Sequence, residues 1–187
     1  MRAVRAITLV VLMSLVGTTA WADEYDDAIA LFKNAGQSAA FFGKSYGYAV
    51  FPTIGKGGLG VGAAHGSGRV YEHGKYVGDA RMNQVSVGLQ AGGQAYSQIV
   101  FFEDERAFRE FTAGDFAFGA DVGAVVITSS ASASAGSKGQ SAGASGGKKD
   151  AATVGKYNKG MAVFTIVKGG AMYEATVAGQ KFKYKPR

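Results

Sequence analysis

The chain has 187 residues, a formal net charge of +6 and no cysteine. The absence of cysteine excludes disulfides, thiolate chemistry and an acylated cysteine anchor. The length suits one compact domain with a core of its own.

The positive charge is concentrated at the C-terminal end. Residues 23–137 carry 8 Lys/Arg against 12 Asp/Glu, whereas residues 138–187 carry 10 Lys/Arg against two acids. A field of one sign attracts an anionic partner, although lysines also keep a β-rich protein soluble, and both interpretations remain open.

The first 22 residues have the features of a secretory signal peptide. Arg2 and Arg5 precede an apolar run over residues 6–16, and residues 20–22 offer a small-x-small cleavage site. The run is shorter than the ~20 residues of a membrane span. We therefore expect an exported protein that is periplasmic, associated with the cell envelope or secreted, with a single domain over residues 23–187.

Two short helices and an extended segment follow the signal peptide. Residues 23–35 carry acids in the first turn, where the helix dipole favours negative charge, and Gly36 ends their helical pattern. A second helical segment is predicted over residues 38–44. Residues 48–51 are then extended, and Pro52 is expected to end this strand.

The centre of the chain is glycine-rich and reads as successive β-strands. Two runs alternate small residues with the apolar residues Leu59, Val61 and Ala63, and Val85, Val87, Leu89 and Ala91. A period of two predicts strands. A face so rich in glycine predicts that backbone, a helix or a bend of the sheet approaches closely. Between the runs, His73-Gly74 predicts a tight hairpin turn.

The remaining elements alternate between strand and helix. The predicted elements are a strand over residues 96–102, a helix over 103–113, a long strand over 116–126, a mobile Ser/Gly/Ala-rich loop over 129–149, a strand over 161–168, a turn at 169–170 and a strand over 171–178. Together the elements predict an α+β fold: a twisted, mostly antiparallel sheet or partly closed β-barrel with two or three short helices packed on it.

Motifs for catalysis lack their structural context. The G-x-G-x-x-G spacing at residues 55–60 precedes more strand and no helix, and the two G-x-S-x-G matches lie in the loop at 129–149. His65 and His73 have no recognisable metal-ligand spacing. We expect no enzyme, cofactor or metal site.

Several ordered motifs resemble the SYLF domain family. The residues that carry the resemblance are Tyr46-Gly47-Tyr48-Ala49-Val50-Phe51-Pro52, Lys56-Gly57-Gly58-Leu59-Gly60-Val61-Gly62, His65-Gly66-Ser67-Gly68, Val87-Gly88-Leu89-Gln90-Ala91-Gly92-Gly93-Gln94 and Phe118-Gly119-Ala120-Asp121. Eukaryotic SYLF domains bind phosphoinositide-containing membranes, some also bind actin filaments, and exported bacterial members are described as lipid-binding. The resemblance implies a binding module without a catalytic site.

The N-terminal segment departs from the family pattern. Eukaryotic members use a basic amphipathic segment there, whereas residues 23–27 here are acidic. Lys33 and Lys44 remain as lipid-binding candidates in that region. The stronger candidates are the cations of the tail, Lys181, Lys183, Lys185 and Arg187, each worth ~1 kcal/mol near an anionic surface.

The sequence thus predicts peripheral association with anionic phospholipids or a membrane surface, with phosphoinositide-like headgroups implied by the resemblance. The alternative is a structural or protein-interaction module of the cell envelope. Nucleic acid and actin are not expected as partners, and the sequence leaves the oligomeric state open.

Overall fold

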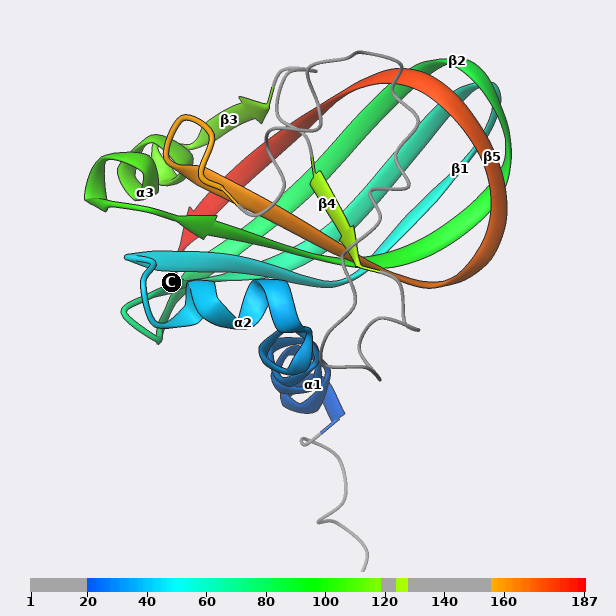
Figure 1. Cartoon of the computed structure of the whole chain (residues 1–187). Helices are drawn as coiled ribbons and strands as arrows, with labels where there is room; N and C mark the ends of the chain where they lie inside the picture. Colours follow the sequence, from blue (N-terminus) through cyan, green and yellow to red (C-terminus); the bar gives the residue numbers. More distant parts are fainter. Residues whose placement is uncertain (1–19, 119–123, 128–155) are drawn as a thin grey trace, which may run out of the picture.

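The computed structural model describes residues 20–118, 124–127 and 156–187. These residues form helices packed on a sheet of long strands (Figure 1). The elements are α1 Ala20–Asn34, α2 Gly36–Phe42, β1 Gly47–Glu72, β2 Lys75–Phe102, α3 Glu105–Thr112, β3 Asp115–Phe118, β4 Ala124–Ile127 and β5 Met161–Pro186. The fold is α+β with a mostly antiparallel sheet, as the sequence predicts.

Within the described residues, the sheet has five strands in the order β1-β2-β5-β3, with β4 also paired to β5. β1 and β2 form one long antiparallel hairpin, from Gly47 opposite Phe102 to Glu72 opposite Lys75. β5 runs antiparallel along β2 over nearly its whole length. β3 pairs antiparallel and β4 parallel with different ends of β5. The three long strands therefore form the framework, and the short ones extend its edge.

The three long strands bend partway along their length, on the side of the molecule away from α3 (Figure 1). The bend divides them into two arms. We call residues 47–57 of β1, 93–102 of β2 and 161–169 of β5 the helix-covered arm. We call residues 61–72 of β1, 75–87 of β2 and 179–186 of β5 the open arm. The arms face each other, as the rings of Phe51 and Phe182, whose centroids are 5.5 Å apart, show.

The glycines of the open arm allow this close approach. A Cβ atom at Gly68 would lie 2.6 Å from Cδ1 of Phe51 and 2.7 Å from the carbonyl oxygen of Val50, both on the helix-covered arm. A Cβ atom at Gly66 would meet Ile54 in the same way. In the first predicted run, close approach is confirmed at Gly58, where a Cβ atom would collide with the backbone of Gly62, but Gly60 has no such neighbour.

The main core lies between the two arms. Its fully buried large side chains include Phe51, Phe102, Phe111, Phe182 and Met82. α3 contributes Phe111 together with Ala107 and Phe108, so this helix covers one end of the core. Burial of each such side chain stabilises the fold by roughly 1.5–3 kcal/mol.

A polar layer also joins the arms inside the sheet. Gln98 of the helix-covered arm is fully buried, and its amide nitrogen donates to the side-chain oxygen of Gln180 at 3.1 Å. The Gln180 amide nitrogen in turn lies 3.1 Å from the side-chain oxygens of Gln84 and Gln98. Because buried amides are costly without partners, these hydrogen bonds fix how the arms face each other.

α1 and α2 cover the outer face of the helix-covered arm, where a second core cluster forms. The cluster joins Phe32 of α1 to Val50, Ile99, Phe101 and Phe164 of the strands. The fully buried Ser38 hydroxyl donates to the Phe32 carbonyl at 2.6 Å and so fixes the junction between the helices. The other face of this arm meets the main core, so residues 49–52, 96–102 and 161–166 are buried on both sides.

The hairpin turn between β1 and β2 is confirmed. His73 and Gly74 are the two turn residues, and their φ values are 47° and 79°. Positive φ at both central residues is the geometry of a type I′ turn, whose twist matches that of antiparallel strands. Glycine adopts it without steric cost.

Three predicted strand boundaries are wrong. Pro52 does not end a strand, because a register shift between Phe51 and Ile54 accommodates it inside β1. Residues 169–170 are not a turn, since β5 continues through them while paired to Ala95 and Gln94 of β2. Residues 116–126 are not one strand, because β3 and β4 run in opposite directions relative to β5.

Two other predictions concern residues that the structure does not describe. The signal peptide over residues 1–22 lies mostly outside the described part, which begins at Ala20, and the mobile loop at 129–149 lies entirely outside it. Both stay predictions.

Candidate functional site

The outer face of the open arm is exposed and its residues alternate strictly. Along β1, residues 62, 64, 66 and 68 are buried while Val61, Ala63, His65 and Ser67 face outward. Along β2, Ala80, Met82 and Gln84 are buried while the residues between them are exposed. The pleat of a strand sends successive side chains to opposite faces. On both strands, every second side chain therefore packs between the arms, and the residues between them lie at the outer surface.

A row of cations lies on this face. Lys181, Lys183 and Lys185 of β5 are all exposed, with the buried Phe182 and half-buried Tyr184 between them pointing the other way. Arg81 of β2 is also exposed and stands directly opposite Lys183. Like charges opposite each other across a strand pair are destabilising. The pairing of Arg81 with Lys183 therefore does not stabilise the sheet, and an external anion would reduce the repulsion between the two cations.

Two acids stand near the row without forming ion pairs with it. Asp79 lies opposite Lys185, and its carboxylate accepts a hydrogen bond from the Tyr76 hydroxyl at 2.6 Å. Asp115 of β3 lies opposite Lys183 on the other side. In the part of the chain that the structure describes, none of the three lysines of the row forms an ion pair. The lysines of the row thus keep their charge available to solvent.

Arg187 and Arg69 extend the positive charge past the end of the row. The guanidinium carbons of both residues lie 5.0 Å from the ring centroid of Tyr76. Arg69 also lies 4.1 Å from the ring centroid of Tyr25 on α1. A guanidinium over an aromatic face is held by the ring quadrupole and keeps its charge. The predicted Arg187 is therefore placed next to the lysines.

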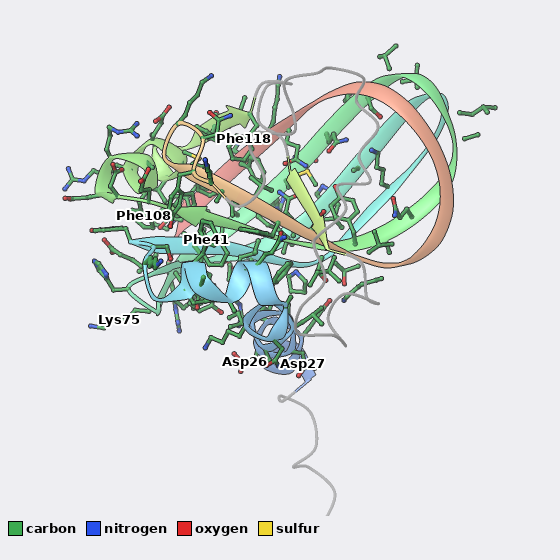
Figure 2. All side chains as sticks on the ribbon, viewed as in Figure 1. Asp26, Asp27, Phe41, Lys75, Phe108 and Phe118 are labelled. Atoms are coloured by element: carbon green, nitrogen blue, oxygen red, sulfur yellow. The ribbon has the colours of Figure 1, made fainter. Side chains whose placement is uncertain are left out.

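Lys33 and Lys44 lie elsewhere. Both are exposed; Lys33 is in the last turn of α1, with its Nζ 5.5 Å from the Phe42 ring centroid, and Lys44 follows α2. These helices pack on the outer face of the helix-covered arm, whereas the row lies on the outer face of the open arm. Figure 2 shows Asp26 and Asp27 on the same helix as Lys33, away from the sheet. The structure thus brings four of the six predicted cations together and separates the other two.

Sequence reasoning missed one feature of the open arm. Four large aliphatic side chains, Leu59 at the bend and three at the adjoining end of the open arm, are exposed: Leu59 by 83%, Val61 by 61%, Val85 by 64% and Val87 by 62%. We call these four residues the aliphatic patch. The alternation with small residues was visible in the sequence, but it did not reveal that Gly62 and Ser86 are buried while the aliphatic residues beside them face solvent.

The histidines have local partners. A ring nitrogen of His65 lies 2.8 Å from the side-chain oxygen of Asn83, and the His73 ring packs 4.3 Å from the Tyr46 ring. Within the described residues, no three His, Cys, Asp or Glu side chains are grouped so as to hold a metal ion. In the same part of the chain, no helix is both long enough and apolar enough to span a membrane.

The fold and this sheet face define an α+β domain with an exposed, basic surface at one side. The model of the Ysc84 family, described as "Las17-binding protein actin regulator", matches residues 83–185, more than half of the chain. The chain therefore belongs to this family, the SYLF family indicated by its sequence motifs. The matched region contains most of β2 and nearly all of β5, including the lysine row.

The chain is also similar to a curated protein, beta cell expansion factor A of Aeromonas veronii. The two are 30% identical over 156 residues, which cover 82% of this chain and 51% of that protein. The chain thus spans about half the length of this relative. No solved structure matches the chain.

Proposed function

We propose that the protein is a non-catalytic binding module that associates peripherally with anionic lipid through the outer face of the open arm. The observation that carries this proposal is the row of Lys181, Lys183 and Lys185 beside Arg81, all exposed on one sheet face. Near an anionic membrane each such cation contributes ~1 kcal/mol, and the contribution falls off within about 10 Å at moderate salt. Membership of the SYLF family, in which lipid binding is described, supports the same proposal.

Co-sedimentation with vesicles tests the proposal. The protein should bind vesicles of mixed phosphatidylcholine and phosphatidylglycerol, bind pure phosphatidylcholine much less, and lose affinity as salt increases. Replacing Lys181, Lys183 and Lys185 by Gln removes ~3 kcal/mol of attraction, so affinity should fall roughly a hundredfold.

The matched control changes charge on the helices and not on the face of the lysine row. Replacing Lys33 and Lys44 by Gln should alter affinity only a few-fold, because these residues do not share the face of the lysine row. Equal losses in the two variants would show that net charge, and not this face, determines binding. Binding that neither salt nor the triple substitution changes would refute the proposal.

The second candidate function is a protein-interaction module of the cell envelope. The family description names a protein partner, and the exposed aliphatic patch offers a surface for one. Recovery of an envelope protein by the immobilised chain, together with absence of vesicle binding, would favour this alternative.

A further inference from the structure

The aliphatic patch is continuous across two strands. Val61 of β1 stands directly opposite Val87 of β2, and Val85 stands opposite Ala63, which is also exposed. Leu59 follows on the same strand with most of its surface in solvent. Isolated exposed aliphatic residues are ordinary, but contiguous ones on a folded domain mark an interaction site.

The patch lies where the sheet bends, so it is at an extremity of the molecule (Figure 1). A register shift between Leu59 and Val61 places Gly60 at φ 72°. A bulge of this kind bends the strand and redirects side chains. Leu59, Gly60 and Val61 are all exposed at this point, whereas the residues that follow in the open arm alternate between buried and exposed.

Cations border the patch on the same face. On β2, Asn83 lies two residues from Val85 and stands opposite Lys181. Arg81 lies two residues further along the strand and stands opposite Lys183. At about 3.3 Å per residue, the nearer of these pairs is about 7 Å from Val85. An apolar surface next to cations is complementary to an anionic lipid layer, which offers phosphates above acyl chains.

We propose that the aliphatic patch enters the acyl region of an anionic phospholipid bilayer while Arg81, Lys181 and Lys183 contact the headgroup phosphates. This inference rests on the proposed function and adds an apolar contribution to it. The cations attract the protein to the surface, and insertion of the patch makes the complex resistant to salt. Screening weakens the first contribution but leaves the second.

A second copy of the chain fits the patch less well than lipid does. Four aliphatic side chains cover on the order of a few hundred Å², below the roughly 800 Å² per partner of a stable interface. A symmetric contact would also bring the cations of both copies towards the same interface, where they would repel. The bilayer neutralises those cations instead.

The experiment compares variants on vesicles of phosphatidylcholine and phosphatidylglycerol at low and high salt. The patch variant carries Leu59→Gln, Val61→Thr, Val85→Thr and Val87→Thr, which keep β-branched residues at three exposed strand positions. The control is Ala40→Ser, at an exposed position of α2 that is not on this face. The patch variant should bind at least tenfold more weakly, and binding at high salt should disappear; the control should bind like the unsubstituted protein.

The single substitution Leu59→Gln covers the case in which the fourfold variant fails to fold. It should cause a smaller loss of affinity in the same direction.

Depth is measured with tryptophan and acyl chains that carry a quencher. Val87→Trp should be quenched on binding, and Ala40→Trp, on α2, should not. Equal affinities of the patch variant and the unsubstituted protein, or equal quenching at both positions, would overturn the inference while leaving the proposed function intact. Absence of binding by the unsubstituted protein would refute the proposed function itself. Dimers that the patch substitutions convert to monomers, seen by sedimentation, would assign the patch to a second copy and overturn the inference.

Discussion

Gly68 shows how a missing side chain determines the fold at the level of single residues. The position has no room for a Cβ atom, because Phe51 and the Val50 carbonyl would lie within 2.7 Å of it. Gly68→Ala must push the arms apart or force Phe51 from its position, and overpacking of this kind costs ~1–3 kcal/mol. Denaturant unfolding should show a loss of stability of that size.

Gly55→Ala is the matched control. Gly55 is an exposed residue of the same strand, and a Cβ atom added there would meet no atom within 4 Å beyond its chain neighbours. Its substitution should change stability by less than ~0.5 kcal/mol. If both substitutions cost the same, the loss comes from the general effect of alanine in this strand and not from contact between the arms.

The residues that face outward were only partly predictable. The spacing of Lys181, Lys183 and Lys185 around the aromatic Phe182 predicts one exposed basic face, and the structure places them so. The same period of two in Val85 and Val87 does not say which face is buried. That choice depends on Gly66 and Gly68 meeting the other arm of the sheet, a contact between residues distant in sequence.

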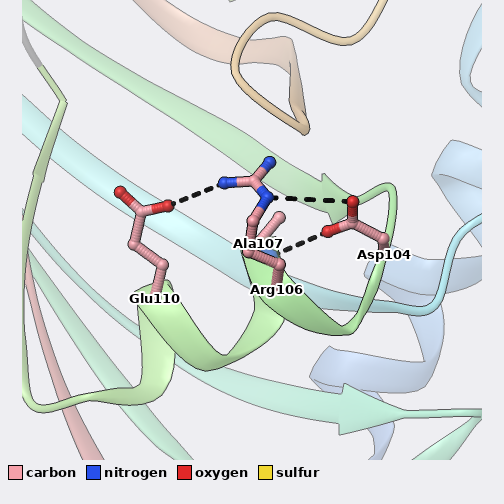
Figure 3. A network of polar contacts seen from close by, with 4 residues as sticks. All are labelled: Asp104, Arg106, Ala107 and Glu110. Atoms are coloured by element: carbon pink, nitrogen blue, oxygen red, sulfur yellow. Dashed lines mark hydrogen bonds and ion pairs between the residues drawn. The ribbon is translucent and has the colours of Figure 1, made fainter.

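At the scale of elements, α3 depends on its N-cap (Figure 3). The Asp104 side chain accepts a hydrogen bond from the Ala107 amide at 2.8 Å, which satisfies a helix-end donor. Asp104→Ala should therefore cost ~1 kcal/mol of stability in denaturant unfolding. The loss should be global because α3 carries Phe111 into the core between the arms.

Glu110→Ala tests whether the cap or the surface charges of α3 matter. Glu110 pairs with Arg106 at 3.2 Å, but both side chains are more than half exposed. Such pairs contribute ~0.3–0.5 kcal/mol, so the expected loss is smaller than that of Asp104→Ala. A larger loss from Glu110→Ala than from Asp104→Ala would contradict the cap as the main determinant.

The helices were more predictable than the strands because their signals are local. The acids before residue 107 and the glycine at 114 delimit α3 to within two residues of the structure. The strand ends at Pro52 and at residues 169–170 were wrong because pairing with β2 overrides the local turn preference. One long strand with a bulge and two strands joined by a turn have the same sequence pattern, and only the pairing with the neighbouring strand distinguishes them.

At the scale of the whole molecule, the sequence predicts the fold class but not the division of the cations. The charge of the C-terminal part is evident from composition, and β5 does present it on one face. Lys33 and Lys44 do not share the face of the lysine row because α1 and α2 cover the helix-covered arm. The sequence alone does not show this. The arrangement of the arms therefore decides which predicted cations can act together.

The attachment of α2 to the helix-covered arm predicts how the molecule responds to alkali. Tyr48 packs against Phe42 of α2 and Tyr157 against Phe41, with ring centroids 5.2 and 5.1 Å apart. Burial raises the pKa of each of these tyrosines to about 12 from an ordinary value of 10.0. The phenols are thus held neutral in the folded protein over a range in which the unfolded chain ionises them.

The sign of the effect follows from proton binding. Below about pH 10 both states keep the phenolic protons, so these tyrosines give no pH dependence. Between about pH 10 and 12 the unfolded chain binds fewer protons than the folded protein, so the free energy of unfolding falls as pH rises. Denaturant unfolding at a series of alkaline pH values, with tyrosinate absorbance as a second signal, measures the slope.

Tyr48→Phe with Tyr157→Phe should reduce this dependence because phenylalanine has no proton to release. Part of the slope should remain, since the hydrogen bond to Glu72 raises the pKa of Tyr46 to about 12 as well. The Tyr157 hydroxyl is buried and has no hydrogen-bond partner among the described residues, so Tyr157→Phe alone should not lower stability at neutral pH. Hydrogen exchange over the same pH series tests whether the titration releases the helices. If it does, protection of the backbone amides should be lost first in the segment that contacts α2. An unchanged slope in the double variant would show that other groups cause the alkaline transition and that burial under α2 does not.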